Sequence, residues 1–213
     1  MASERAAHES EESSEEEICK TLRKTNALEF GAFRLSSGRV TPYYVDLRVI
    51  PSFPDAFRSI SDIFVDAIKK ELGAESFDRV SGIPIAGTPF AAVAAFHLSK
   101  PFLYTRQKRR LRGRERRVEG VLMPGDRVLL VDDLATTGLS LKRAAAAIRA
   151  EGGVVTDAFV LVDREEGAKD RLAESGINLH SVLKMSKAAG RLYEMNAIDE
   201  DQLSIILKQG RRG

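Results

Sequence analysis

Residues 128–140, VLLVDDLATTGLS, constrain the fold of this chain more than any other segment. The segment opens with four apolar residues, whose length and branching are typical of a strand buried in a parallel sheet. Two adjacent carboxylates, Asp132 and Asp133, come next, and a turn of small and hydroxyl-bearing residues then precedes a helical run. This order predicts a strand–turn–helix unit of an open α/β sheet, in which ligands bind beyond the carboxyl ends of the strands.

The turn at residues 135–140 has the composition of a phosphate-binding loop. Small residues allow backbone N–H groups to surround a phosphate, and the positive end of the following helix adds to the attraction. A carboxylate pair beside such a loop suits sugar hydroxyls or a divalent cation. The segment therefore predicts a site for a phosphorylated sugar. The alternative is a simple strand–turn–helix corner in which Asp133 caps the helix.

Apolar periodicity along the rest of the chain predicts alternating strands and helices. The expected strands are residues 33–35, 43–46, 80–83, 101–104, 128–131, 158–162 and 179–183. The expected helices are residues 17–31, 53–72, 88–98, 139–151, 166–175, 188–197 and 200–209. This alternation indicates an α/β fold with a mainly parallel sheet flanked by helices. With 213 residues, 43% of them hydrophobic, the chain is long enough for one domain with a real core.

Charge is distributed unevenly along the chain. Residues 1–17 hold seven glutamates against one arginine and few residues to bury, which predicts an acidic disordered tail or a frayed helix before a single domain at 18–213. Residues 105–117 hold eight basic residues against one glutamate. Nearly all of the excess positive charge therefore lies in one short stretch.

Several classes of protein are excluded by what the sequence lacks. No apolar stretch reaches the roughly 18 residues of a membrane span, and the acidic start does not resemble a signal peptide, so we expect a cytoplasmic protein. Cys19 is the only cysteine, which fits a reducing compartment, and the three histidines are too scattered for a zinc pattern. Neither a Walker A loop nor a GxGxxG fingerprint is present, which argues against a dinucleotide cofactor.

The segment at 128–140 resembles the phosphoribosyl pyrophosphate (PRPP) signature of type I phosphoribosyltransferases. The resemblance implies that fold, with a small N-terminal hood at roughly 18–50 and a core at roughly 51–197. It implies that Asp132 and Asp133 hold the ribose as catalytic residues. It also implies that the following loop binds the 5′-phosphate through Ala135, Thr136, Thr137, Gly138 and Ser140.

A second small-residue turn lies in residues 81–89, SGIPIAGTP, again between an expected strand and an expected helix. Its glycine leaves space for backbone N–H groups to approach an anion, although an ordinary helix start has the same pattern. Beside the PRPP segment, it resembles the family's pyrophosphate loop, which implies PRPP contacts from Ala86 and Gly87. That loop usually contains a non-proline cis peptide, expected here around residues 85–86. Some relatives carry a lysine at the position of Ala86.

Within that family, residues 18–197 resemble orotate phosphoribosyltransferases, through FGAFRLSSGR at 30–39, PYYVDLR at 42–48 and VDREEG at 162–167. The resemblance implies orotate contacts from Arg164, Thr136, Ser36 and Tyr44. An arginine suits this substrate, because guanidinium makes paired hydrogen bonds to planar acceptors such as a carboxylated pyrimidine. The alternatives are a solvated charge cluster around Arg164 and a core role for the tyrosines at 43 and 44.

The basic stretch at 105–117 resembles the family's mobile catalytic loop, which reaches into the neighbouring site of a homodimer. Arg106 matches the leading arginine and is expected to bind PRPP. Arg110 stands where relatives have a lysine, and Arg112 where many have a histidine. Since arginine does not readily donate a proton, Arg110 would act electrostatically, unless Lys108 takes the catalytic role of that lysine.

The resemblance predicts a magnesium-dependent enzyme that joins orotate to PRPP and releases pyrophosphate, with Mg²⁺ held mainly through PRPP. Its expected partners are the two substrates and a second copy of the chain. One alternative is transfer to another base. Another is a PRPP-sensing regulator that binds nucleic acid through residues 105–117, although that stretch has no aromatic residues on which bases could stack.

Overall fold

The computed structural model describes residues 2–34, 40–106 and 117–210. Its centre is a six-stranded sheet in the order β5-β4-β3-β6-β7-β8. The strands are β3 (Arg79–Gly82), β4 (Phe102–Thr105), β5 (Val118–Glu119), β6 (Val128–Ala135), β7 (Asp157–Asp163) and β8 (Asn178–Lys184). Neighbouring strands run parallel except for the β4–β5 pair at one edge. The predicted mainly parallel sheet is thus confirmed.

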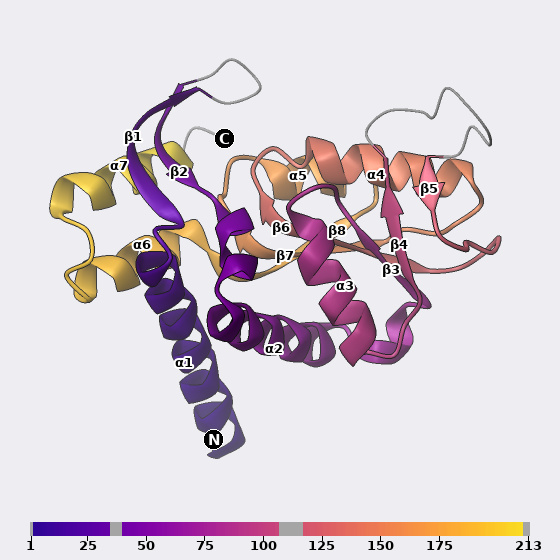
Figure 1. Ribbon diagram of the computed structural model, residues 1–213, viewed down its shortest axis with the longest axis horizontal. Helices are drawn as coiled ribbons and strands as arrows, with labels where there is room; N and C mark the ends of the chain where they lie inside the picture. The colour runs from indigo at the N-terminus through magenta and orange to yellow at the C-terminus, as the bar shows by residue number, and fades with distance from the viewer. Residues whose placement is uncertain (1, 35–39, 107–116, 211–213) are drawn as a thin grey trace.

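Helices cover both faces of the sheet, as Figure 1 shows. The helices α2 (Pro54–Glu71) and α3 (Gly87–His97) lie on one side, and α4 (Leu139–Ala150) and α5 (Ala168–Ala173) on the other. Alternate residues of β6 face the two sides, because Leu129 and Val131 belong to one apolar cluster and Val128 and Leu130 to the other. Burial on both faces explains why this strand is continuously apolar.

Two further helices, α6 (Met185–Glu194) and α7 (Glu200–Gly210), end the described chain. Of the helices in the described residues, none is long and apolar enough to cross a membrane. Two predicted helices have different boundaries in the structure. The helix expected at 166–175 shortens to α5, and the helix expected at 188–197 begins earlier, at Met185.

The N-terminal region departs most from the sequence prediction. Helix α1 (Ala2–Lys24) ends before Asn26, whose φ is +51°, and residues 28–31, expected to be helical, lie in β1 (Leu28–Arg34). β1 pairs antiparallel with β2 (Val40–Val45), and Leu28 lies opposite Val45. The prediction of a helix to residue 31 is wrong because this long-range pairing outweighs local periodicity. The two strands form a hairpin that projects from the sheet (Figure 1), as a hood would.

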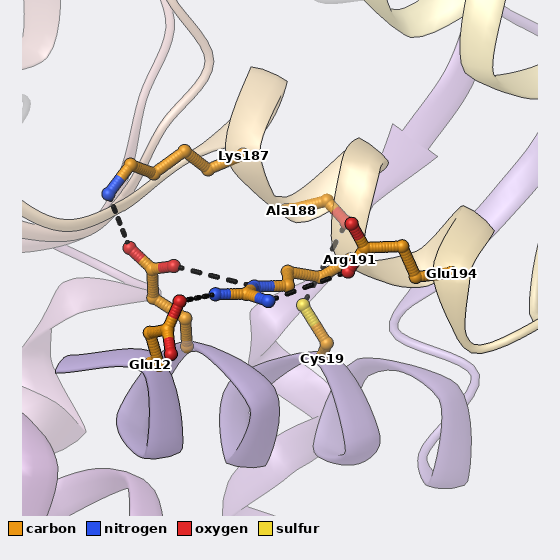
Figure 2. Close-up of polar contacts among 7 residues, drawn as sticks. Glu12, Cys19, Lys187, Ala188, Arg191 and Glu194 are labelled. Carbon is orange, nitrogen blue, oxygen red and sulfur yellow. Dashed lines mark hydrogen bonds and ion pairs between the residues drawn. The ribbon is translucent and has the colours of Figure 1, made fainter. Parts of the chain in front are cut away.

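Residues 12–17 belong to α1 and are not a disordered tail. Glu15 is buried, and its carboxylate lies 2.8 Å from Nζ of Lys187 on α6. Glu12 lies 2.9 Å from Nη2 of Arg191, and the Cys19 thiol donates to the carbonyl oxygen of Ala188 (Figure 2). The acidic residues are therefore ordered by basic partners that lie far away in the sequence.

His180 on β8 provides a test of the fold by pH. Its ring nitrogens lie 3.1 Å from Glu71 of α2 and 2.9 Å from Asp157 of β7, and the hydrogen bond to Glu71 contributes most to raising its pKa above 6.5. A raised folded-state pKa adds stability below pH 6.5, and that stability is lost as the pH rises through the folded value. We expect His180→Gln to lower the free energy of unfolding more at pH 5.5 than at pH 8.5, as measured by urea titration. An equal loss at both pH values would contradict this.

Candidate active site

The acidic pair lies within strand β6 rather than after it. β6 was expected to end at residue 131, but it continues to Ala135, because Asp132 and Leu134 stay in register with Val160 and Val162 of β7. The Asp132 carboxylate accepts a hydrogen bond from the backbone N–H of Asp133 (3.0 Å). Both side chains are therefore fixed by the sheet itself rather than by a loop.

Burial of this pair is electrostatically unfavourable. Asp132 is 7% exposed and Asp133 8%. Burial raises the pKa of both carboxyl groups, and the charge of Asp133 raises the pKa of Asp132 further. Perturbed carboxyl groups of this kind are concentrated at functional sites. The pair is thus poised to accept hydroxyl donors or to neutralise a cation.

The loop after β6 leads directly into α4. Gly138 precedes the helix with φ at +72°, and a Cβ there would lie 3.2 Å from Leu172 of α5. No side chain caps the first turn, so its N–H groups remain available to an anion. The alternative in which Asp133 caps this helix is wrong, because Gly138 occupies that position. Within the expected phosphate loop, Ala135 is buried, Thr136 and Thr137 are half-buried, and Ser140 is exposed.

The second small-residue turn lies beside the first. β3 and β6 are neighbours, and the N–H of Ile83 donates to the carbonyl oxygen of Val131 (3.0 Å). α3 begins at Gly87, packed so closely on β6 that a Cβ would lie 2.5 Å from Oδ1 of Asp132. The cis peptide joins Pro84 to Ile85, one bond before the expected position. The structure therefore brings Ala86 and Gly87 against the acidic pair.

Arg164 follows β7 and lies between the sheet and the hood. Its guanidinium is 2% exposed, with Nη2 2.7 Å from Oε1 of Glu166. The same nitrogen donates to Oγ1 of Thr41 (3.3 Å), and the guanidinium lies 4.3 Å from the centre of the Tyr43 ring. The alternative of a solvated cluster around Arg164 is wrong, because Arg164 and Glu166 are both buried.

The two tyrosines of the hood have different environments. Tyr43 is fully buried beneath Arg164, as its core alternative expects, whereas Tyr44 is half-buried and packs on Phe33. Burial alternates along β2, so the two side chains point to opposite faces of the strand. The structure therefore does not place Tyr44 and Arg164 on the same face of the hood.

Both ends of the basic stretch are anchored. The N–H of Arg106 donates to the carbonyl oxygen of Arg117 (2.7 Å), and the Arg106 guanidinium pairs with Glu119 of β5. Glu151, after α4, accepts from the N–H groups of Arg117 and Val118. Sequence reasoning missed β5 and both glutamates, because a strand of two residues has no periodicity. Ser36, Lys108, Arg110 and Arg112 lie outside the described residues.

Two further residues near the acidic pair were not expected at the site. Asp46 caps η1 (Leu47–Ser52), and its carboxylate binds the Arg48 guanidinium. Its charge also contributes to raising the pKa of Asp133. Both residues lie in the segment 42–48 that carries the family resemblance. Their position relative to the acidic pair depends on how the hood folds, which the sequence does not show.

The residues present fit magnesium only as a partner of a substrate. In the described part of the chain, no group of three or more His, Cys, Asp or Glu side chains could hold a metal ion. Asp132 and Asp133 supply two carboxylates, and Mg²⁺ commonly binds one or two carboxylates together with substrate phosphates. The donor set therefore suits a cation that arrives with a phosphorylated ligand.

Comparison with known proteins agrees with this geometry. Residues 52–180 match the family described as phosphoribosyl transferase domain, which is more than half of the chain. The chain, with its acidic pair between two helix starts, thus belongs to the phosphoribosyltransferase class.

Individual relatives narrow the class. The orotate phosphoribosyltransferase of Cenarchaeum symbiosum is 42% identical over 180 residues, covering 84% of this chain and 90% of that protein. The one from Staphylothermus marinus is 41% identical, with 90% and 92% covered. The chain belongs to the orotate phosphoribosyltransferase family.

Solved structures show the same fold. The crystal structure of orotate phosphoribosyltransferase from Aeropyrum pernix matches with a TM-score of 0.72 and 35% identity, covering 84% of this chain and 99% of that one. The UMP synthase of Leishmania donovani matches with a TM-score of 0.83 and 29% identity. This chain is covered over 93% of its length there but spans only 42% of that protein.

The buried acidic pair predicts a gain of stability when its charge is removed. Because the pKa of Asp132 is raised above 3.8, the folded state keeps a proton that the unfolded state has lost, and stability falls as the pH rises above about 4. Asp132→Asn should increase the free energy of unfolding at pH 7 by ~1–3 kcal/mol, and by less at pH 4. Urea titration at both pH values measures this. A less stable variant at pH 7 would contradict it.

The buried ion pair predicts a loss of stability when one partner is removed. Arg164→Ala leaves Glu166 buried and unpaired, which should lower the free energy of unfolding by about 3–5 kcal/mol. The exposed pair of Arg127 and Asp78 is the control, and Arg127→Ala should cost less than ~1 kcal/mol. Thermal and urea unfolding of both variants test the difference. Similar losses of stability in Arg164→Ala and Arg127→Ala would contradict the prediction that the buried pair contributes more than the exposed pair.

Proposed function

We propose that this chain transfers the 5-phosphoribosyl group of PRPP to orotate, giving orotidine 5′-monophosphate and pyrophosphate. The observation that carries the proposal is the buried pair Asp132–Asp133 between the starts of α3 and α4. Family membership supports orotate as the acceptor. The relation to orotate phosphoribosyltransferases also supports a place in pyrimidine biosynthesis.

PRPP has two phosphorylated ends, and the site has an anion-binding element for each. We assign the 5′-phosphate to the loop at 135–140, where N–H groups at the start of α4 lack side-chain caps. We assign the pyrophosphate to Ala86 and Gly87 at the start of α3. Asp132 and Asp133 would then accept hydrogen bonds from the ribose hydroxyls between them. Binding of the remote phosphate can help align the reacting carbon.

Catalysis in this site is mainly alignment and charge stabilisation. As the bond to pyrophosphate breaks, positive charge grows on the ribose, where the carboxylates of Asp132 and Asp133 face it. Negative charge grows on the pyrophosphate, near the N-terminus of α3, and we assign Arg106, Arg110 and Lys108 to that charge. Mg²⁺ bound with PRPP would supply further Lewis-acid stabilisation of the leaving group.

The base is assigned to the space between sheet and hood. Nε of Arg164 is buried and has no hydrogen-bond partner among the described residues, so it is a donor available to a planar acceptor. Thr136 follows β6 on the same edge of the sheet. We retain Ser36 and Tyr44 as further orotate contacts in this proposal, with Tyr44 acting from the other face of β2.

The remaining parts of the proposal concern assembly and surroundings. By resemblance to the family, a second copy of the chain would contribute residues 105–117 to this site. Both ends of that segment are anchored within their own chain, beside β4. Closure over the substrates would exclude water, which otherwise hydrolyses PRPP. A reducing compartment such as the cytoplasm fits the single buried thiol of Cys19.

The assay is the loss of orotate absorbance on mixing the purified chain with orotate, PRPP and Mg²⁺. We expect a loss that needs both PRPP and Mg²⁺, and Asp132→Asn should lower the rate at least ~100-fold, because the ribose loses a carboxylate partner. Asp78→Asn, an exposed aspartate at the opposite end of the strands, should keep the rate within about twofold.

Two outcomes would contradict the proposal. PRPP binding without orotate turnover would direct attention to other bases or to a PRPP-sensing role. Full activity of Asp132→Asn would show that the charge of Asp132 is not needed for catalysis, whichever base is the substrate.

A further inference from the structure

At the foot of the hood, Arg48 is held in a fixed orientation by two side chains. Its Nε lies 2.6 Å from Oδ1 of Asp46, and its Nη2 lies 2.8 Å from Oδ2 of the same carboxylate. Nη2 also donates to Oη of Tyr44 (3.1 Å). A guanidinium held at two edges of its fork has little rotational freedom left, so its remaining edge points in a defined direction.

That remaining edge is available to a ligand. Nη1 has no hydrogen bond with any residue in the described part of the chain, and the Arg48 side chain is 55% exposed. Capping of η1 does not require this arrangement, because Asp46 caps that turn through the backbone N–H of Arg48 (3.1 Å). The side-chain contacts of Arg48 with Asp46 are therefore not needed to begin this helix.

Arg48 lies within electrostatic reach of the acidic pair. The hydrogen bond to Asp46 contributes most to raising the pKa of Arg48, and the charge of Asp133 adds to it. Burial contributes most to raising the pKa of Asp133, and the charge of Asp46 adds to it. The geometric link of Arg48 to the site is its hydrogen bond to Oη of Tyr44, which the proposed function places at the orotate. A substrate oxyanion that approaches Asp133 meets repulsion from that carboxylate, and Arg48 is a cation placed to offset it.

The position of Arg48 is distinct from that of Arg164. Arg164 contacts Thr41 and Tyr43, which point to the buried face of β2, whereas Arg48 contacts Tyr44, which points to the other face. The two arginines therefore flank the hood strand from opposite sides. One is buried and paired with Glu166, and the other is half-exposed with a free edge.

We propose that Arg48 binds an oxyanion of a substrate at the rim of the acidic pair, either the carboxylate of orotate or the diphosphate of PRPP. The proposal rests on the proposed function, since it assigns a substrate contact in the same site. Asp46 and Tyr44 act as positioning residues that orient the guanidinium.

The chain contains a matched control for this assignment. Arg127 binds Asp78 through the same two-point fork, at 3.0 and 2.8 Å, and its side chain is 48% exposed. That pair precedes β6 and β3, at the opposite end of the strands from the acidic pair. Removing either arginine breaks an exposed ion pair of the same kind, but only Arg48 lies at the site.

The experiment compares the wild-type chain with Arg48→Ala, Arg48→Lys and Arg127→Ala. Calorimetry with PRPP and Mg²⁺ alone gives the Kd of PRPP, and the absorbance assay gives kcat and the KM of orotate. We expect Arg48→Ala to raise one of these binding constants at least ~10-fold, while Arg127→Ala stays within about twofold. Arg48→Lys should recover only part of the loss, because lysine lacks the fork.

The constant that changes identifies the oxyanion. A raised KM of orotate with an unchanged Kd of PRPP assigns the orotate carboxylate, and a raised Kd of PRPP assigns the diphosphate. Values of both constants within twofold of wild type in Arg48→Ala, or a fall in kcat alone, would overturn the proposal. Absence of orotate turnover in the wild-type chain would instead overturn the proposed function, and the Kd of PRPP would still test Arg48.

Discussion

The burial of two carboxylates at the end of β6 is the constraint on which the rest of this structure depends. A buried carboxylate is stable in its ionised form only with hydrogen-bonding or charged partners, and the described residues provide few such partners for this pair. Asp132 accepts from the N–H of Asp133. The remaining stabilisation has to come from the rigid sheet, which holds the pair in place through its register with β7.

A second dependence joins the hood to the sheet. The hairpin of β1 and β2 lies outside the main sheet, and Arg164 connects it to β7 through Thr41, 123 residues away in the sequence. The same guanidinium pairs with Glu166 and packs on Tyr43. One buried side chain thus fixes the distance between the two layers that enclose the base in the proposed function.

The sequence predicted the central sheet well, because β6 and β7 contain continuous apolar runs and small-residue turns follow β3 and β6. It also placed Asp132, Asp133 and Gly87 at one edge of that sheet, since parallel strands bring their carboxyl ends together. It predicted only the end of β1, through the strand expected at 33–35, because pairing of the first residues of β1 with β2 outweighs their helical periodicity. Arg48 was missed for a related reason, because its role depends on the fold of the hood.

The close packing of Gly87 on Asp132 has a consequence for the entropy of binding. Gly87 has no side chain of its own between α3 and the backbone of Val131 and Asp132, so the separation at this point does not vary with the rotamers of an α3 side chain. Ligand groups that span them meet a surface whose geometry exists before binding, so little conformational freedom is lost when they bind. The residues that still have freedom to lose are those at the exposed rim, so the entropy cost of ordering side chains on binding is expected to arise there.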